Sequence, residues 1–532
     1  MFSSFLESLS LDHQELTSLP LAVSVVVSSV VLYVVSSYLG EQTRRRNLPK
    51  GVCLPPHLTS YIPFIGSGLQ LISGLTRDFI LKSAKKLKTP VFTANISGTK
   101  CVFIADPELV FTVFKDSIEE IDSLSLQKKA MSSISGVDPS IVEACLSNQE
   151  MSKAAMGQIH KHLIQSDHLS KNIESVQHVF ENTLQSMDLP KGGDEWKSFP
   201  MFEFVRKVIF FASIGPIVSE GLNQDEVVQD YSKFEDGIAL MFSDAPSFIT
   251  KENVAARERL VQILQTSQVH EGFSDFMKER QELLGYDKEL MARMNVGMFI
   301  ATVSNSIPSV FWILCHLLHT PETFAACVQE VQKVAKKKSK NDTHSKFFTL
   351  EELDEMKLLE SCFKESLRMY QSFFATRNVT GDFILNPKEK NGPQYLIEKG
   401  TRIMAYPQTV HMDPAIFQDP TEFRFDRFLH PTEKAPDGKL LSSYLRPFGG
   451  GAHLCPGRKF ISYEARAFLA MLLLNVDMKL QDIDEPIPDI QLQRQGFSVA
   501  HPKKDPTFLV KVKTNTRSSW RAMARDRLVA YS

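Results

Sequence analysis

The chain has 532 residues, 43% of them hydrophobic and 23% charged, which is ordinary for a globular protein although long for a single domain. Its net charge of −2 gives no indication of a nucleic-acid partner. The seven cysteines are scattered, odd in number and without a Cys-x-x-Cys pair, which argues against a disulfide framework or a zinc site and for a reducing compartment.

A membrane-spanning helix is predicted from residue 19 to residue 39. These 21 residues carry no charge, and as a helix they would extend about 32 Å at ~1.5 Å per residue, enough to cross a bilayer core. Acidic residues precede the segment and basic residues follow it, so the positive-inside rule places residues 1–18 in the lumen and the remainder in the cytosol. A cleaved signal peptide is the alternative, but the apolar run is too long for one. We therefore expect an uncleaved, single-pass anchor.

Residues 40–66 are expected to form a basic, proline-rich linker, because prolines at 49, 55, 56 and 63 prevent a continuous helix and stiffen the chain. The catalytic domain is then expected over residues 67–514. It should be mostly helical after a β-hairpin at 89–105, whose turn is predicted at Gly98–Lys100. Residues 515–532 form a tail with four arginines and one acid, for which we expect a disordered or membrane-surface segment.

One long apolar helix is predicted from residue 287 to residue 318. Pro308 would remove one of its hydrogen bonds and kink it. Just before the proline lie two adjacent polar residues, Ser304 and Asn305. One interpretation of Asn305 is a buried amide satisfied by a carbonyl one turn back. The alternative is a functional amide.

The most informative stretch runs from Phe448 to Gly457, with the sequence F-G-G-G-A-H-L-C-P-G ahead of a long apolar-periodic segment. Three consecutive glycines allow the backbone to turn where side chains would clash. Cys455 then stands beside the first turn of a predicted helix, where amide groups and the helix dipole stabilise a thiolate. Such a thiolate suits the axial position of a haem iron. A buried free cysteine is the alternative.

This stretch resembles the haem-binding loop of the cytochromes P-450. Every fixed position of the family's pattern is filled, by Phe448, Gly451, His453, Cys455 and Gly457. The resemblance implies haem b, iron protoporphyrin IX, as the cofactor bound by these residues, with Cys455 as the metal ligand. It also implies a mainly α fold, a helical haem domain with small β-sheets behind the single N-terminal transmembrane helix.

Two charged residues on one helix face, Glu365 and Arg368, are a weak signal alone, because such i,i+3 pairs contribute only ~0.2–0.5 kcal/mol. Arg427 follows in the sequence F-R-F-D-R-F. Together the three residues resemble the Glu-Arg-Arg network of the same family. The resemblance implies a structural clamp beneath the haem loop and no part in the chemistry.

The resemblance also places Arg377 against one haem propionate, with a surface arginine as the alternative. His453 would contact the other propionate, at a position where most relatives carry Arg. Many members contact a propionate through a tryptophan and an arginine on one helix. No such pair occurs between residues 120 and 170, so that contact stays unassigned.

Most members of the family carry an acid and a threonine where this chain has Ser304 and Asn305. An asparagine followed three residues later by proline is the pattern of a subgroup that includes the sterol 7α- and 12α-hydroxylases and prostacyclin synthase. The resemblance therefore implies that Asn305 and Ser304 are catalytic, with the Asn305 amide donating hydrogen bonds to oxygen at the haem.

Taken as a whole, the resemblance implies a monooxygenase of the endoplasmic reticulum membrane whose catalytic domain faces the cytosol. It would hydroxylate a sterol or oxysterol, as in 7α-hydroxylation, with O2 and with electrons that NADPH–cytochrome P-450 reductase takes from NADPH. An endoperoxide isomerase like prostacyclin synthase, which needs neither oxygen nor a reductase, is the main alternative. A haem-binding protein without turnover is a third.

Overall fold

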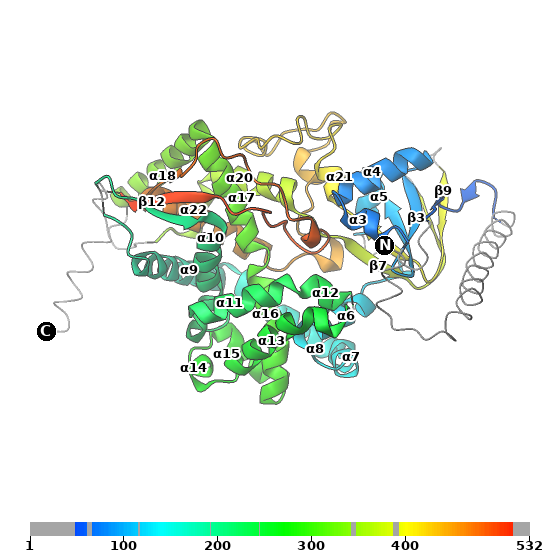
Figure 1. Cartoon of the computed structure of the whole chain (residues 1–532), viewed down its shortest axis with the longest axis horizontal. Helices are drawn as coiled ribbons and strands as arrows, with labels where there is room; N and C mark the ends of the chain where they lie inside the picture. The colour runs from blue at the N-terminus through cyan, green and yellow to red at the C-terminus, as the bar shows by residue number, and fades with distance from the viewer. Residues whose placement is uncertain are drawn as a thin grey trace, which may run out of the picture.

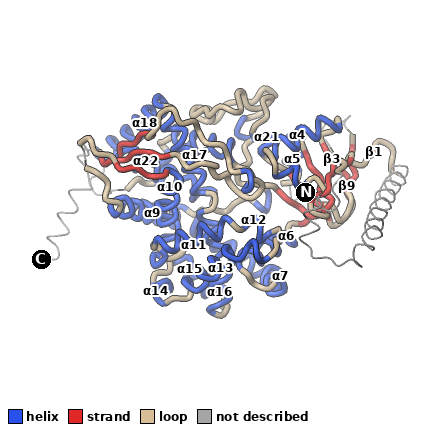
Figure 2. The backbone as a smooth tube through the Cα atoms, viewed as in Figure 1, coloured by secondary structure: helices blue, strands red, loops and turns tan. Residues whose placement is uncertain are grey.

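The computed structural model describes residues 48–60, 66–114, 118–191, 193–243, 245–341, 347–386 and 393–513. The predicted anchor at 19–39 and the predicted tail at 515–532 lie outside these ranges. Where the chain is described, helices predominate over three small sheets, which confirms the predicted mainly α fold. Figure 2 shows the strands gathered toward two opposite ends of the molecule, with helices between them.

The α-helices of the described chain are joined mostly by short connections. In chain order they are α3 Gly68–Ile72, α4 Thr76–Leu87, α5 Pro107–Thr112, α6 Leu124–Ser135, α7 Pro139–Ser147, α8 Gln149–Leu163, α9 Ser166–Ser186, α10 Met201–Ile217, α11 Asp225–Asp236, α12 Ile238–Phe242, α13 Ser247–Leu264, α14 Ser267–Glu271, α15 Asp275–Leu284, α16 Lys288–Val303, α17 Ser306–His319, α18 Pro321–Asn341, α19 Leu350–Asp354, α20 Lys357–Tyr370, α21 Gln408–His411 and α22 Arg458–Asn475. Short 3-10 helices are η1 Glu220–Leu222, η2 Leu441–Tyr444, η3 Gly451–His453 and η4 Leu492–Arg494.

The largest sheet has six strands in the order β2-β3-β4-β10-β7-β5. Its hairpin, β3 and β4, confirms the predicted hairpin, but the turn is Ser97–Gly98, earlier than predicted. Both turn residues have positive φ, +47° and +78°, as a two-residue turn that matches the twist of the strands requires. The strands are β2 His57–Leu58, β3 Val91–Ile96, β4 Thr99–Ile104, β10 Arg402–Ala405, β7 Ala375–Val379 and β5 Ile121–Asp122.

Two three-stranded sheets complete the fold, in the orders β1-β9-β8 and β11-β12-β6. Because β1 and β2 pair with β9 and β3, the end of the predicted linker is already part of the folded domain. The predicted domain boundary at residue 67 is therefore too late. The strands of these two sheets are β1 Val52–Cys53, β9 Gln394–Ile397, β8 Phe383–Leu385, β11 Val476–Leu480, β12 Thr507–Val512 and β6 Lys197–Pro200.

The helices α16 and α17 run through the middle of the helical part, and α17 contacts α10, α20 and α22 (Figure 1). Every residue of α17 from Ser306 to Leu318 is buried. A helix that is apolar on all sides belongs inside a core or a membrane. By length and composition, Lys288–His319 is the one helix in the described chain that could cross a membrane. However, 72% of its most apolar 18-residue stretch is buried within the fold. It is the core of the helical part.

The predicted long helix is interrupted where the prediction placed its kink. α16 ends at Val303, Ser304 and Asn305 form a turn, and α17 begins at Ser306. Pro308 stands in the first turn of α17, where the missing N–H costs little because the first N–H groups of a helix have no partner within the helix. The helical pattern of backbone hydrogen bonds resumes at Ser309, whose N–H donates to the Asn305 carbonyl at 3.2 Å.

Candidate haem site

The loop that carries Cys455 is held in a fixed turn by its own backbone. The Cys455 N–H donates to the Phe448 carbonyl at 2.9 Å, which closes the loop just before α22 begins. Gly449 and Gly451 have φ of +75° and +61°, which residues with a Cβ rarely adopt. A Cβ on Gly449 would also lie 3.2 Å from the His453 carbonyl oxygen. The glycine run therefore sets the path that leads to Cys455.

A cavity of about 430 Å³ lies between this loop and the interruption of the central helix. Cys455 and Phe448 of the loop line it, together with Ala301, Thr302 and Asn305 of the central helix and its interruption. Gly457 borders it as well, and a Cβ there would lie 3.9 Å from the Cys455 sulfur. A cysteine sulfur and polar side chains thus border one cavity, as a haem with a sulfur ligand would require.

The Cys455 thiol is less acidic than the sequence suggested. The N–H groups of Gly457 and Arg458 and the charge of Arg458 lower its pKa, as expected at the start of a helix, but burial outweighs them and raises the pKa. The predicted thiolate is therefore not a property of the loop alone. A thiol in this setting loses its proton when a metal ion takes its place.

A second, polar cavity of about 350 Å³ adjoins the first, and His453 lines both. Arg377 enters it from β7 and is 8% exposed, so the alternative of a surface arginine is wrong. Cationic and hydrogen-bonding side chains suit the carboxylates of a haem. The structure thus places the two residues predicted to contact the propionates, Arg377 and His453, at the same cavity.

Two further residues of this cavity escaped the sequence analysis. The Ser123 Oγ lies 3.1 Å from Nε2 of His453, and the Gln127 Nε2 lies 3.4 Å from Nδ1. Both residues come from the 120–170 region, at the start of α6, where the expected tryptophan and arginine are missing. One feature of the sequence could have located the start of this helix, namely Asp122. Its carboxylate accepts hydrogen bonds from the Leu124 and Ser125 N–H groups and so caps the beginning of α6.

Asn305 faces the first cavity with a defined orientation. Its Oδ1 accepts a hydrogen bond from the Val499 backbone N–H at 3.1 Å. A backbone N–H can only donate, so the atom that it meets must be the amide oxygen and the NH2 group lies at the other end. Asn305 is exposed to the cavity, and the hydrogen bond that its side chain makes in the described chain runs to this distant N–H and not to a carbonyl one turn back.

Ser304 does not share this cavity, which corrects the prediction that pairs it with Asn305. It is 4% exposed, and its hydroxyl lies near the buried Glu235 of α11. Glu235 accepts a hydrogen bond from Tyr231 at 2.9 Å and lies 3.2 Å from the Arg494 guanidinium. Successive residues of a helix point about 100° apart, so two neighbours at this turn face different surroundings.

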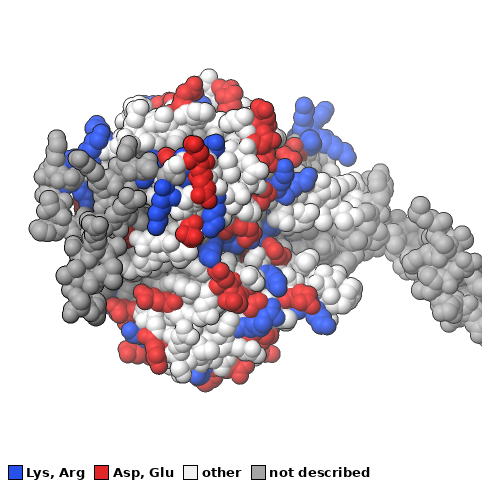
Figure 3. All heavy atoms as spheres, turned by 60° about the vertical axis from the view of Figure 1, so that its left-hand side comes forward, with Lys and Arg blue, Asp and Glu red and all other residues white. Residues whose placement is uncertain are grey.

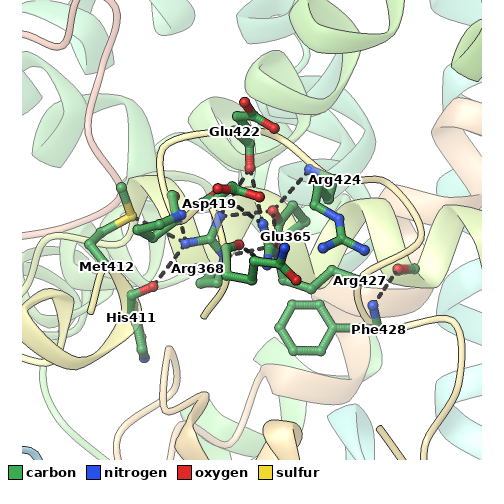
Figure 4. A network of polar contacts seen from close by, with 12 residues as sticks. Glu365, Arg368, His411, Met412, Asp419, Glu422, Arg424, Arg427 and Phe428 are labelled. Atoms are coloured by element: carbon green, nitrogen blue, oxygen red, sulfur yellow. Dashed lines mark hydrogen bonds and ion pairs between the residues drawn. The ribbon is translucent and has the colours of Figure 1, made fainter. Parts of the chain in front are cut away.

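The predicted Glu-Arg-Arg network is assembled as a buried clamp (Figure 4). Both carboxylate oxygens of Glu365 accept hydrogen bonds from the Arg368 guanidinium at 2.8 Å. Its Oε1 also accepts a hydrogen bond from Nε of Arg427 at 2.9 Å. The Arg368 guanidinium also donates to the carbonyls of His411 and Pro420, both at 2.8 Å. The clamp fastens α20 to the segment that leads toward the Cys455 loop, and it lines neither cavity, as expected of a structural network.

Comparison with known proteins agrees with this geometry. The family model described as Cytochrome P-450 matches residues 272–508. Cytochrome P-450 7B1 of Mus musculus is 28% identical over 505 residues, covering 90% of this chain and 93% of the relative. The 7-alpha-hydroxycholest-4-en-3-one 12-alpha-hydroxylase of Homo sapiens is 27% identical, covering 85% and 92%. The 25-hydroxycholesterol 7-alpha-hydroxylase of Rattus norvegicus is 29% identical, covering 66% and 86%.

Among solved structures, retinoic acid-bound cyanobacterial CYP120A1 superposes with a TM-score of 0.63 at 17% identity, covering 87% of this chain and all of that chain. At that identity the likeness concerns the fold alone. Since the fold, the matched Cys455 loop, the Glu365 clamp and the curated relatives agree, the chain belongs to the cytochrome P-450 family and is a cytochrome P-450 monooxygenase.

Proposed function

We propose that the chain hydroxylates a sterol or oxysterol, in the manner of a sterol 7α-hydroxylase, with O2 and electrons derived from NADPH. The observation that carries the proposal is a cavity bordered both by Cys455 and by the oriented amide of Asn305. Several curated relatives are sterol hydroxylases by name, acting on 25-hydroxycholesterol, cholesterol or 7-alpha-hydroxycholest-4-en-3-one.

Haem b is the cofactor that the two cavities would bind. Cys455 would be the metal ligand, with Phe448, Gly451 and Gly457 shaping the loop, and with Arg377 and His453 at the propionates. When bound, a haem with a thiolate ligand supplies the activation of O2 and the insertion of one oxygen atom into an unactivated C–H bond. The protein supplies ligation, orientation and the exclusion of water.

Asn305 has a narrower task than the acid and threonine of other family members. An amide carries two N–H groups but no titrating proton, so it orients a water or an oxygen species and cannot act as the acid. Its bond to Val499 keeps the NH2 group free for that task. Protons must therefore reach the cavity from another residue or from water.

A lipid substrate suits the walls of the cavity. Apolar side chains from four different parts of the fold border it, namely Leu163, Ile217, Met298 and Phe497. Burial of a sterol against them would be favourable by roughly 25 cal/mol per Å² of apolar surface. Residues 19–39 would anchor the enzyme in the endoplasmic reticulum membrane, from which such a substrate is supplied, with the catalytic domain in the cytosol.

Reduction would come from NADPH–cytochrome P-450 reductase. Lys439, Arg446, Arg458 and Lys459 lie near the haem loop in sequence. Two of them have local partners, since Lys439 pairs with Glu108 at 2.8 Å and the Arg458 guanidinium donates to the Cys455 carbonyl at 3.0 Å. Lys459 is exposed and would meet an acidic partner domain.

The test is turnover of the haem-loaded, full-length chain with reductase, NADPH and a panel of sterols and oxysterols. We expect a hydroxylated sterol whose formation requires NADPH and O2, and none from Cys455→Ala. Rearrangement of a prostaglandin endoperoxide without NADPH would establish the isomerase alternative instead. Sterol binding with no product under either condition would identify a haem-binding protein without turnover.

A further inference from the structure

A buried ion pair joins the end of α11 to the segment 494–499. The Arg494 guanidinium lies 3.2 Å from the Glu235 carboxylate and 3.0 Å from the carboxylate of its neighbour Asp236. The side chains of Glu235 and Arg494 are 2% and 11% exposed, whereas Asp236 is exposed. Arg494 and Asp236 are 258 residues apart in the sequence, so the contact ties together two distant parts of the chain.

Glu235 is ionised although it is buried. Burial acts to raise its pKa, but the charge of Arg494 is the largest of several effects that outweigh burial and lower the pKa. Replacing a buried ion pair by uncharged side chains of similar volume often leaves the free energy of unfolding unchanged or raises it. Stability therefore does not explain why the chain buries this pair. A fixed geometry between the two elements that it joins is the better explanation.

The 494–499 segment borders the haem cavity, which Phe497 and Val499 line. The Val499 N–H donates to Oδ1 of Asn305 at 3.1 Å, so the position of this backbone group sets the orientation of the amide. Phe497 lies edge-on to Phe242 of α12, with the ring centroids 5.9 Å apart. The path of the segment thus determines both a wall of the cavity and the direction of the Asn305 NH2 group.

Successive residues of the segment are attached to different parts of the fold. Arg494 contacts the end of α11. The Gln495 side chain accepts a hydrogen bond from the Thr76 N–H of α4 at 3.0 Å, and Gly496 forms a β-bridge with Phe373. The segment is therefore held between α11 and the region around α4, and loss of the Arg494 contacts would release its attachment to α11.

We propose that the Glu235–Arg494 ion pair positions Asn305 for the reaction. It does so by fixing the 494–499 segment, through which Val499 holds the amide. Both members of the pair are positioning residues, since neither is among the described residues that line the two cavities. Without the pair the segment shifts, and the amide no longer holds its NH2 group toward the cavity. This inference rests on the proposed function, because it concerns the task given there to Asn305.

The first test needs no turnover. The variant Glu235→Gln/Arg494→Met removes both charges together, so neither is left buried alone, and the full-length, haem-loaded protein should fold. Hydrogen exchange in peptides that cover residues 494–501 should become faster by about tenfold or more. Arg259→Met/Asp230→Asn is the matched control, because it removes an ion pair of 2.6 Å that joins α11 to α13 instead. It should leave exchange at 494–501 unchanged.

Wild-type exchange at 494–501 in Glu235→Gln/Arg494→Met would overturn the inference, whatever the enzyme oxidises. Equal acceleration in the control variant would also overturn it, because any loosening of α11 would then have the same effect. If the double variant is not recovered, Asp236→Asn takes its place, since it removes the exposed partner of Arg494. It should accelerate the same exchange to a smaller extent, and unchanged exchange would count against the inference.

The second test asks whether the pair acts through Asn305. Glu235→Gln/Arg494→Met should keep the haem spectrum, yet form about tenfold less product per NADPH and release hydrogen peroxide, because a displaced group loses much of its effect. In an Asn305→Ala background the same two substitutions should cause no further loss, since residues that act as one unit are not additive. A full further loss there would overturn the inference.

The failure of the proposed function would look different. If wild type hydroxylates no sterol, or if Asn305→Ala keeps the wild-type yield, the proposed substrate or the proposed task of Asn305 fails. Hydrogen exchange at 494–501 then still decides whether the ion pair fixes the segment that holds the amide.

Discussion

At the scale of single residues, one hydrogen bond decides what Asn305 can do. Its partner, Val499, is 194 residues away in sequence, so the orientation of the amide could not be predicted from the motif. The loop that carries Cys455 and His453 could be located from its local glycine pattern, whereas Arg377 was placed only by the resemblance to the family. Ser304 could not, since its direction depends on the exact residue at which the central helix is interrupted.

The role of Asn305 can be tested with two substitutions. Asn305→Ala removes the amide, whereas Asn305→Asp keeps an oxygen for the Val499 N–H and replaces the NH2 donors with a second, charged carboxylate oxygen. Loss of one positioned donor commonly lowers the rate about 100-fold or more, so both variants should hydroxylate slowly and form hydrogen peroxide from NADPH. Haem content and sterol binding should match wild type. Unchanged rate and coupling in Asn305→Ala would show that the NH2 group has no role.

The ligand assignment for Cys455 has a spectroscopic test. The reduced carbon-monoxide complex of wild type should absorb at the position typical of a thiolate ligand. Cys455→Ala should lose that band, because within the described chain Cys455 is the only cysteine that lines the cavity. Retention of the band in the variant would assign the ligand to another residue.

At the scale of elements, the strongest signals were periodic or capped segments. The hairpin at β3 and β4 and the outer ends of α16 and α17 were predicted nearly to the residue, but the interruption between these two helices was predicted only as a kink. The two-residue strands β1 and β2 are too short for any periodicity and acquire their structure by pairing with distant strands. Ser123 and Gln127 were missed for a similar reason. Their role depends on contact with His453, which lies 326 residues or more away in the sequence.

The clamp between α20 and the following segment should be needed for folding. Arg368→Ala leaves Glu365, which is fully buried, without one of its partners, and breaking a buried pair costs about 3–5 kcal/mol. Little haem-loaded protein should be recovered. Arg424→Ala is the control, since Arg424 reaches Glu365 only through its backbone N–H and its side chain is 40% exposed. Stable, haem-loaded but inactive Arg368→Ala protein would contradict the structural role.

At the scale of the whole molecule, charge is distributed without a dominant sign. On the face shown in Figure 3, acidic and basic side chains are interspersed, in keeping with a net charge of −2. Association with a reductase would therefore depend on a local basic patch and not on net charge. The basic residues near the Cys455 loop were predictable from the sequence, but the engagement of Lys439 by Glu108 was not.

Reductase-supported turnover should therefore respond to Lys459. Lys459→Glu should lower the rate at low ionic strength, and high salt should lower the wild-type rate in the same way, because screening weakens electrostatic steering. Lys439→Glu is less informative, since it would also break the contacts with Glu108 and Asp437. Turnover that is insensitive both to salt and to Lys459→Glu would contradict reductase docking at this face.

Stability against acid provides a prediction for the folded domain as a whole. Burial, followed by the nearby charges of Arg368 and Arg446, lowers the pKa of His411 from 6.5 to about 3. Between these values the unfolded chain binds one more proton than the folded one. This part of the stability is therefore complete above pH 6.5 and is lost as the pH falls toward 3, at about 1.4 kcal/mol per pH unit.

The measurement is denaturant unfolding of the haem-loaded protein between pH 7.5 and 4.5. His411 accepts the Arg446 N–H at 3.0 Å through Nε2, and the side-chain oxygen of His411→Gln can take over that bond. His411→Gln should therefore unfold with a pH dependence that is shallower by about 1.4 kcal/mol per pH unit below pH 6.5. His430→Gln, which alters an exposed histidine, should keep the wild-type slope. Equal slopes for wild type and His411→Gln would mean that His411 is protonated in the folded protein and that its burial does not limit stability in acid.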